Sequence, residues 1–221
     1  MIRKSMAIFL LLIPFLSNSQ VFISDNVTGN IYREAADKSV EGSPFFIDDW
    51  SKGVIYMKDG SKADKFLLKL DALRNELIFL HDGQILSVVN PVKEFVLMPS
   101  DTKQLLFRCG FPAFERYDEN SFYQVLQDGP TSLLKMNRKS IKESTAFNQG
   151  LKKEYILNET YYIVKPGRAP IRIKKDKSSL LEALGDGDGK LAAWMSKNGN
   201  RCRSEDDMAA VVKIFNEGGY K

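Results

Sequence analysis

The stretch NELIFLHDGQILSVV (residues 75–89) decides the fold, because it contains two apolar runs on either side of a two-residue turn. Asp82-Gly83 between β-type runs is among the strongest short-range hairpin signals, since both central residues of a type I′ turn need positive φ. The same arrangement occurs around Asp59-Gly60 and Asp128-Gly129. The sequence therefore predicts antiparallel hairpins, without the strand–helix alternation of a parallel sheet.

This hairpin pattern extends over residues 43–175. In KFLLKLD (65–71), apolar residues recur at every second position, which is the period of a strand with one buried face. We expect eight to ten short antiparallel strands that form one sheet or a partly open barrel. The polar stretch Arg138–Gln149 interrupts the pattern and is predicted to be a mobile loop.

The last segment, residues 176–221, changes to a helical period. Ser179 and Glu182 have the spacing of a capping box, and KLAAWMSK (190–197) carries an apolar stripe. Ser204 is the predicted N-cap of a final helix with an apolar face formed by Met208, Val211, Val212 and Phe215. The expected fold class is therefore α+β, an antiparallel sheet or partly open barrel followed by C-terminal helices that pack on it.

The N-terminus has the layout of a secretory signal peptide. Arg3 and Lys4 precede the apolar run Ala7–Leu16, and small residues follow that run. We predict a signal peptide over residues 1–19, and the alternative is a buried N-terminal helix. Residues 20–42 are predicted to be an irregular lead-in. No later run approaches the ~18 apolar residues of a membrane helix, so we expect an exported, periplasmic or extracellular protein, soluble after cleavage, without a transmembrane segment in the mature chain.

Positive charge is concentrated in one part of the chain. Residues 135–177 contain twelve Lys or Arg and four Asp or Glu. A basic segment attracts anionic partners, and export favours an envelope polymer or lipid head group over nucleic acid. The alternative is a solvated face with no specific ligand.

Cys109 and Cys202 are the two cysteines. In an oxidising compartment a lone pair of cysteines is a disulfide candidate. The alternative is two separate buried thiols, because sequence alone does not bring their Cα atoms within bonding reach.

The stretch GDGDG (185–189) contains the candidate metal ligands, Asp186 and Asp188. When Gly189 is aligned with the glycine of a calcium-binding EF-hand loop, the first and last ligand positions fall on Leu184 and Met195. Neither residue is an oxygen ligand, so the two aspartates are weak candidates. The favoured interpretation is a bend between two helices.

The sequence predicts no catalytic residue and no cofactor site. His81 is the only histidine and would need a nucleophile and a carboxylate from elsewhere in the chain to act as a base. Asp48 and Asp49 next to Trp50 could suit glycan chemistry, but adjacent residues on an extended chain point in opposite directions. Four aromatic residues occur close together, namely Phe111, Phe114, Phe122 and Tyr123. We interpret them mainly as core residues, and the alternative is an exposed partner-binding patch.

Four stretches resemble small exported β-rich proteins of Bacteroidota: GSPFFIDDW (42–50), GVIYMKDG (53–60), LDALRNELIF (70–79) and NPVKEFVL (90–97). The helical ending is also similar to that group. The resemblance implies the fold and transfers no catalytic residue, because the group as a whole has no characterised activity.

These observations together predict a non-enzymatic envelope protein that binds a protein, polymer or lipid partner. Two other functions stay open at this point: a periplasmic hydrolase, and a lipid carrier with a half-barrel cavity.

Overall fold

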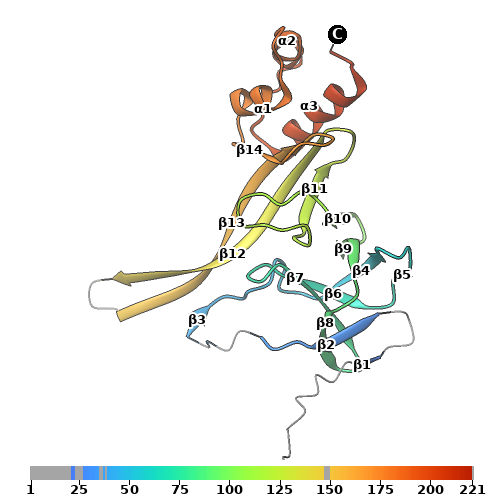
Figure 1. Ribbon diagram of the computed structural model, residues 1–221. Helices are drawn as coiled ribbons and strands as arrows, with labels where there is room; N and C mark the ends of the chain where they lie inside the picture. Colours follow the sequence, from blue (N-terminus) through green and yellow to red (C-terminus); the bar gives the residue numbers. More distant parts are fainter. Residues whose placement is uncertain (1–20, 23–26, 35–36, 38, 147–149, 221) are drawn as a thin grey trace, which may run out of the picture.

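The computed structural model describes residues 21–220 apart from 23–26, 35–36, 38 and 147–149. Within this part of the chain, fourteen strands form one open sheet and three helices follow the last strand (Figure 1). The predicted α+β class is confirmed, and the sheet does not close into a barrel. The predicted signal peptide, residues 1–19, lies outside the described residues.

The strands in chain order are β1 (Val21–Phe22), β2 (Thr28–Ile31), β3 (Val40–Glu41), β4 (Ser51–Met57), β5 (Lys62–Ala63), β6 (Leu67–Asp71), β7 (Glu76–His81), β8 (Gln84–Val88), β9 (Val92–Ser100), β10 (Lys103–Arg108), β11 (Tyr123–Gln127), β12 (Ser132–Ala146), β13 (Gly150–Val164) and β14 (Ile171–Ile173). Their order in the sheet is β1-β2-β8-β7-β6-β4-β9-β10-β11-β12-β13-β14, with β5 beside β4 and β3 beside β13. Among the described strands, only the β3–β13 pairing is parallel.

The turn at Asp82-Gly83 has the predicted geometry. Both residues have positive φ, 48° and 76°, and they connect β7 to β8 with His81 opposite Gln84. Leu68 of β6, directly opposite Phe79 of β7, is buried as the alternating pattern predicts. The hairpins of the first half of the sheet therefore enclose one apolar core, in which Phe95 and Phe107 stack at 4.9 Å between ring centroids.

The predicted loop at Arg138–Gln149 is wrong for the described residues. β12 continues to Ala146 and pairs with β13 in one unbroken register, from Ser132 opposite Val164 to Ala146 opposite Gly150. The polar composition suggested a loop, but a two-stranded ribbon with water on both faces needs no apolar alternation. This hairpin leaves the body of the sheet as a long arm (Figure 1).

The predicted irregular lead-in, residues 20–42, also needs correction, because it contains β1, β2 and β3. β2 pairs with β8 and extends the sheet past its last hairpin. Val27 and Tyr32 are buried at this edge. The segment therefore acquires strand structure from the edge that it covers, which local sequence does not reveal.

The three predicted helices are present as α1 (Lys177–Leu184), α2 (Lys190–Lys197) and α3 (Glu205–Glu217). Ser204 caps α3 as predicted and forms a capping box with Asp207. The predicted capping box of α1 is wrong, because the carboxylate of Asp176 accepts the N–H of Ser179 at 2.8 Å. Asp176 serves equally well as an N-cap and lies one position before the helix begins.

The helices pack on the end of the sheet formed by β11, β12, β13 and β14. Leu133 and Ile163 from these strands are buried with Leu180 of α1, Met195 of α2 and Val211 of α3. Short helices of this kind are stable only when an apolar face is buried in this way. Across the described residues, no helix combines the length and apolar character that crossing a membrane requires.

Candidate functional site

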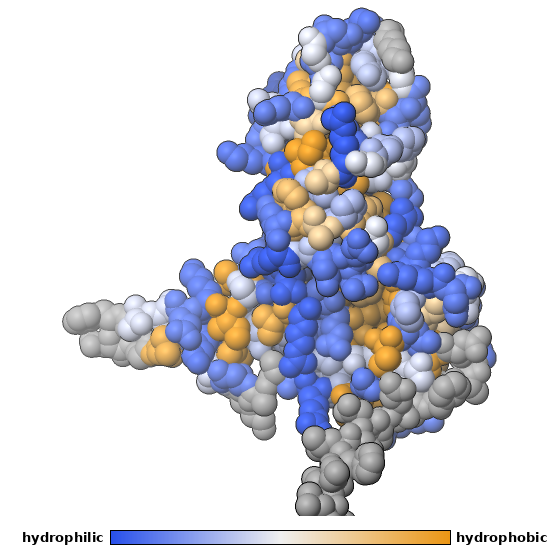
Figure 2. Space-filling view, viewed as in Figure 1, coloured by the Kyte–Doolittle hydropathy of each residue, from blue (hydrophilic) through white to orange (hydrophobic). Residues whose placement is uncertain are grey.

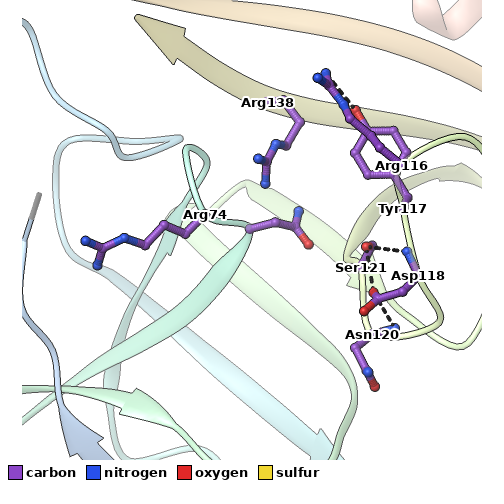
Figure 3. Close-up of a pocket in the computed structure, with 8 residues that line it drawn as sticks. Arg74, Arg116, Tyr117, Asp118, Asn120, Ser121 and Arg138 are labelled. Carbon is purple, nitrogen blue, oxygen red and sulfur yellow. Dashed lines mark hydrogen bonds between the residues drawn. The ribbon is translucent and has the colours of Figure 1, made fainter.

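A surface cavity of about 380 Å³ lies where the β12–β13 hairpin leaves the body of the sheet (Figure 3). Its walls come from the β6–β7 turn, the loop between β10 and β11, and β12. The lining residues are mainly polar and include three arginines. They are Arg74, Asn75, Arg116, Tyr117, Asp118, Asn120, Ser121 and Arg138. We call this the arginine cavity.

The β6–β7 turn that carries Arg74 is held by a buried carboxylate. Asp71 accepts the N–H groups of Leu73 and Arg74 at 2.8 and 2.9 Å, and the hydroxyl of Tyr32 at 2.9 Å. Burial raises the pKa of Tyr32, and the hydrogen bond to Asp71 adds to this rise. The Arg74 guanidinium is already engaged, since it donates to the carbonyl of Arg33 at 2.7 Å.

The same turn is tied to the loop on the other side of the cavity. Asn75 has a positive φ of 62°, and its side chain donates to the carbonyl of Phe122 at 3.1 Å and accepts the N–H of that residue at 2.6 Å. Two segments 47 residues apart in the chain are therefore fixed relative to each other.

The loop between β10 and β11 supplies Arg116 and the remaining wall. Phe114 and Tyr117 exchange two backbone hydrogen bonds of 3.0 Å, which closes a tight turn around Arg116. The Arg116 guanidinium folds over the ring of Tyr117 and donates to its hydroxyl at 3.5 Å. Asp118 accepts the hydroxyl of Ser121 at 2.9 Å, and this bond lowers the pKa of the Asp118 carboxyl.

Arg138 on β12 is the least satisfied of the three arginines. Its side chain is half-buried, and within the described part of the chain it forms neither a hydrogen bond nor an ion pair. Burial lowers the pKa of its guanidinium and the charge of Arg116 lowers it further, while Tyr117 and the carboxylate of Asp71 act in the opposite direction. In Figure 3 the Arg138 side chain points into the space between the Arg74 turn and the loop that carries Arg116.

The electrostatics of the arginine cavity favour an anion. Three arginines and one acidic residue, Asp118, are among the residues that line it, and in Figure 3 the Arg74 guanidinium extends away from Arg138. A guanidinium is planar, always charged and presents several N–H donors in a fork that matches the oxygens of a carboxylate or phosphate. An oxyanion in this cavity would supply the hydrogen bonds that Arg138 does not form inside the protein.

The two weak metal candidates have other partners. Asp186 accepts the N–H groups of Leu191 and Ala192 at 3.0 and 2.9 Å, so its carboxylate caps the first turn of α2. Asp188 accepts the N–H of Lys190 at 3.2 Å. The described residues contain no group of three or more His, Cys, Asp or Glu side chains placed to hold a metal ion. GDGDG (185–189) connects α1 to α2 and forms the bend between these two helices.

His81 does not line the arginine cavity. It lies at the end of β7, with its ring edge-on to Phe66 at 5.6 Å and its Nε2 3.3 Å from the carboxylate of Asp82. Asp48 accepts the hydroxyl of Ser43. Trp50, next to these acidic residues, packs against a small buried cluster formed by Tyr32, Phe45 and Ile78.

The aromatic group belongs to the core, which was its main interpretation. Tyr123 is buried and contacts Phe111, Tyr117 and Tyr162 in edge-to-face pairs with centroids 5.6 to 5.9 Å apart. Phe114 packs on Tyr162, and Phe122 packs on Phe95 in the neighbouring core. These rings pack against the loop that lines the arginine cavity, because Tyr117 belongs to both the aromatic cluster and the cavity wall.

The cysteines are two free buried thiols, the alternative that the sequence left open. Cys109 donates to the carbonyl of Val92, at 3.0 Å, beside the first core. Cys202 belongs to the helical core, and burial raises the pKa of its thiol to about 11.

Sequence reasoning did not find the arginine cavity. Arg74 lies in a turn, Arg116 in a loop, and Arg138 in the stretch predicted to be mobile, so nothing in the sequence connects them. The one available signal was the alternation Leu134, Met136, Arg138, which places a cation on the face of a strand that otherwise enters the core.

Comparison of the chain with protein-family models, with curated proteins and with solved structures finds no match. The function is therefore argued from the residues of this chain.

Proposed function

We propose that this protein is an exported, non-enzymatic binding protein of the cell envelope, and that the arginine cavity binds an oxyanion group of its ligand. The oxyanion is a carboxylate or a phosphate, which are the two groups that a guanidinium fork recognises. Export is supported by the layout of residues 1–19, which is that of a secretory signal peptide.

The observation that carries the proposal is the state of Arg138. Keeping a half-buried cation without a hydrogen-bonded partner costs free energy, so such a residue is a candidate for a functional requirement. Among the three arginines, Arg74 has a carbonyl acceptor and Arg116 a tyrosine hydroxyl, whereas Arg138 has neither. The Arg138 guanidinium is therefore the expected primary contact, and Arg116 the second.

The binding test uses the full mature chain and two probes, inorganic phosphate and succinate, at low ionic strength. Nitrogen-detected NMR follows the side-chain Nε–Hε signals of the arginines during each titration. We expect the Arg138 signal to shift in a saturable way, and the Arg138→Gln variant to bind at least tenfold more weakly. The two probes distinguish a phosphate from a carboxylate ligand.

The matched control is Arg168→Gln, which removes an exposed arginine in the turn after β13. This variant should bind both probes as the wild type does. Equal weakening in the two variants would mean that only net charge matters, and a titration that leaves the Arg138 signal unchanged would refute the site. Arg138→Lys keeps the charge without the fork and should give an intermediate affinity.

A further inference from the structure

In the outer half of the β12–β13 hairpin, the only described strand pairing apart from the hairpin itself is that of β3 with Lys153 and Glu154 of β13. We call this outer half the distal ribbon and define it as residues 139–146 of β12 with residues 150–157 of β13, from Lys139 opposite Leu157 to Ala146 opposite Gly150. In Figure 1 it projects away from the sheet. A two-stranded ribbon is marginally stable in water, and a third strand with a shared apolar face stabilises it.

One backbone edge of the distal ribbon is open. The N–H of Lys139 donates to the carbonyl of Ala72 at 2.9 Å, so at this residue the backbone faces away from β13. Backbone direction alternates along an antiparallel strand, and the backbone groups of Ile141, Glu143 and Thr145 therefore also face outward. β11 covers only residues 133–135 of β12, and no described strand pairs with the edge from Ile141 to Thr145.

One face of the distal ribbon carries exposed apolar side chains between charged ones, since Lys139 and the Glu143–Lys153 pair share it. Ile141, Leu151 and Leu157 are 41, 60 and 42 % exposed, although they are large hydrophobic residues. Their odd positions in the register place them on the same face, where Ile141 lies opposite Tyr155. Figure 2 shows hydrophobic surface on this projecting arm.

The charge of the distal ribbon is positive, since it contains four lysines and two glutamates: Lys139, Lys142, Lys152, Lys153, Glu143 and Glu154. Lys152 and Lys153 form ion pairs with Glu41 and Asp37. Lys142, on the open edge strand, forms no ion pair or hydrogen bond within the described part of the chain. An acidic side chain on an adjacent strand would complement it.

We propose that the open edge of β12 between Ile141 and Thr145 binds an extended segment of a partner protein, which adds a strand to the ribbon on the edge opposite β3. The partner segment alternates apolar and acidic residues, with an apolar side chain beside Ile141 and an acidic side chain beside Lys142. Its backbone bonds to the outward groups of Ile141, Glu143 and Thr145. This surface is separate from the arginine cavity, and its occupation does not depend on an anion there.

The probe is a capped seven-residue peptide of alternating valine and glutamate, and the control peptide has the same composition in two blocks. Amide NMR of the full mature chain should show saturable shifts at Ile141, Glu143 and Thr145. Hydrogen exchange of these three amides should slow more than that of Lys142 and Ser144, which face β13. The block peptide should bind at least tenfold more weakly.

Two variants test the backbone edge and the exposed apolar side chains separately. Glu143→Pro removes one outward N–H and the ion pair with Lys153 without removing a β12–β13 hydrogen bond, and Ile141→Asp places a charge among the exposed apolar side chains. Each should weaken peptide binding at least tenfold. Ile85→Asp, which alters an exposed apolar residue (38 %) on another strand, should leave it unchanged.

Equal binding of the two peptides, or wild-type binding by Glu143→Pro, would overturn the proposal, and Ile141→Asp decides it if Glu143→Pro does not fold. A dimer in light scattering that Ile141→Asp dissociates would assign the edge to a second copy of this chain. Binding to vesicles of anionic lipid that Ile141→Asp abolishes, without peptide binding, would assign it to a membrane. Both results would also overturn the proposal.

Discussion

The two halves of the β12–β13 hairpin share one continuous ladder and have opposite environments. In the inner half, Leu133, Met136 and Tyr162 are fully buried between neighbouring strands, helices and the aromatic cluster. In the outer half, Ile141 and Leu157 remain substantially exposed. The register does not change between them, so the difference comes from the neighbours of the hairpin and not from its own pairing.

The boundary between the two halves is also where the candidate site lies. Arg138 follows the last buried residues of β12 and precedes the distal ribbon. At this position Arg138 is half-buried, and it forms no hydrogen bond or ion pair with a carboxylate of the described residues. The comparison therefore indicates that a half-buried position, where a strand leaves a core, can hold a polar side chain whose hydrogen bonds are available to a ligand.

The largest expected effect is in the buried half. Leu133→Ala removes a fully buried side chain that packs against the helices, and we expect it to lower the free energy of unfolding by about 2–5 kcal/mol. Leu157→Ala, the matched change in the exposed half, should cost less than about 1 kcal/mol. Urea unfolding of both variants measures the difference, and equal losses would mean that the outer half is also buried.

A second effect concerns the ion pair that joins the buried half to α3. Lys135, whose side chain is 8 % exposed, lies 2.8 Å from Glu205 and 3.1 Å from Glu159. Burial alone would raise the pKa of Glu205, but hydrogen bonds from Lys135 and Tyr161 outweigh it and lower that pKa below its ordinary value of 4.5. We expect Glu205→Gln to cost about 2 kcal/mol at pH 7, as for loss of a hydrogen bond to a charged group.

The pH dependence of that cost has a defined sign. Because the pKa of Glu205 is lower in the folded chain, its contribution is present above pH 4.5 and is lost as the pH falls through the folded value. The gap between wild type and Glu205→Gln should therefore shrink below pH 4.5. Asp206→Asn, an exposed change in the same helical turn, controls for the helix dipole, and a gap independent of pH would contradict the assignment.

A smaller effect, of opposite sign, is expected at the boundary. Arg138→Met replaces a half-buried cation without a partner by an apolar side chain of similar length, and we expect about 0.5–1 kcal/mol of added stability. Arg168→Met should change stability by less than about 0.5 kcal/mol. Thermal unfolding without added anions decides this, and destabilisation by Arg138→Met would show that the cation has an internal partner.

The smallest expected effect is that of a reducing agent. With two free thiols, the unfolding free energy should be the same with and without reductant, and the denatured, unreduced chain should release two thiol equivalents. In the native protein, Cys202 should react slowly with a thiol reagent near pH 8, because its pKa of about 11 keeps the reactive thiolate scarce and its side chain is buried against the inner half. No free thiol in the denatured chain would establish a disulfide.

Local signals in the sequence predicted the fold well where a turn or a cap decides the structure. Asp82-Gly83 and Ser204 have conformational preferences of their own, so their hairpin and helix could be located. β2 depends on pairing with the distant β8, and the outer part of β12 is a polar strand without an Asp-Gly turn signal, so composition alone misassigned both. Arg74, Arg116 and Arg138 come from a turn, a loop and a strand that only the tertiary structure brings together, as in the hydrogen bonds between Asn75 and Phe122, which explains why the arginine cavity had no signature in the sequence.

The most direct test of the arginine cavity is the effect of phosphate on the unfolding free energy of the mature chain. A ligand that binds only the folded state raises this free energy with its concentration, as its dissociation constant dictates. We predict that phosphate stabilises the wild type and Arg168→Gln equally, and leaves Arg138→Gln with less than a third of that increment at every concentration. Equal stabilisation of all three proteins would contradict the site.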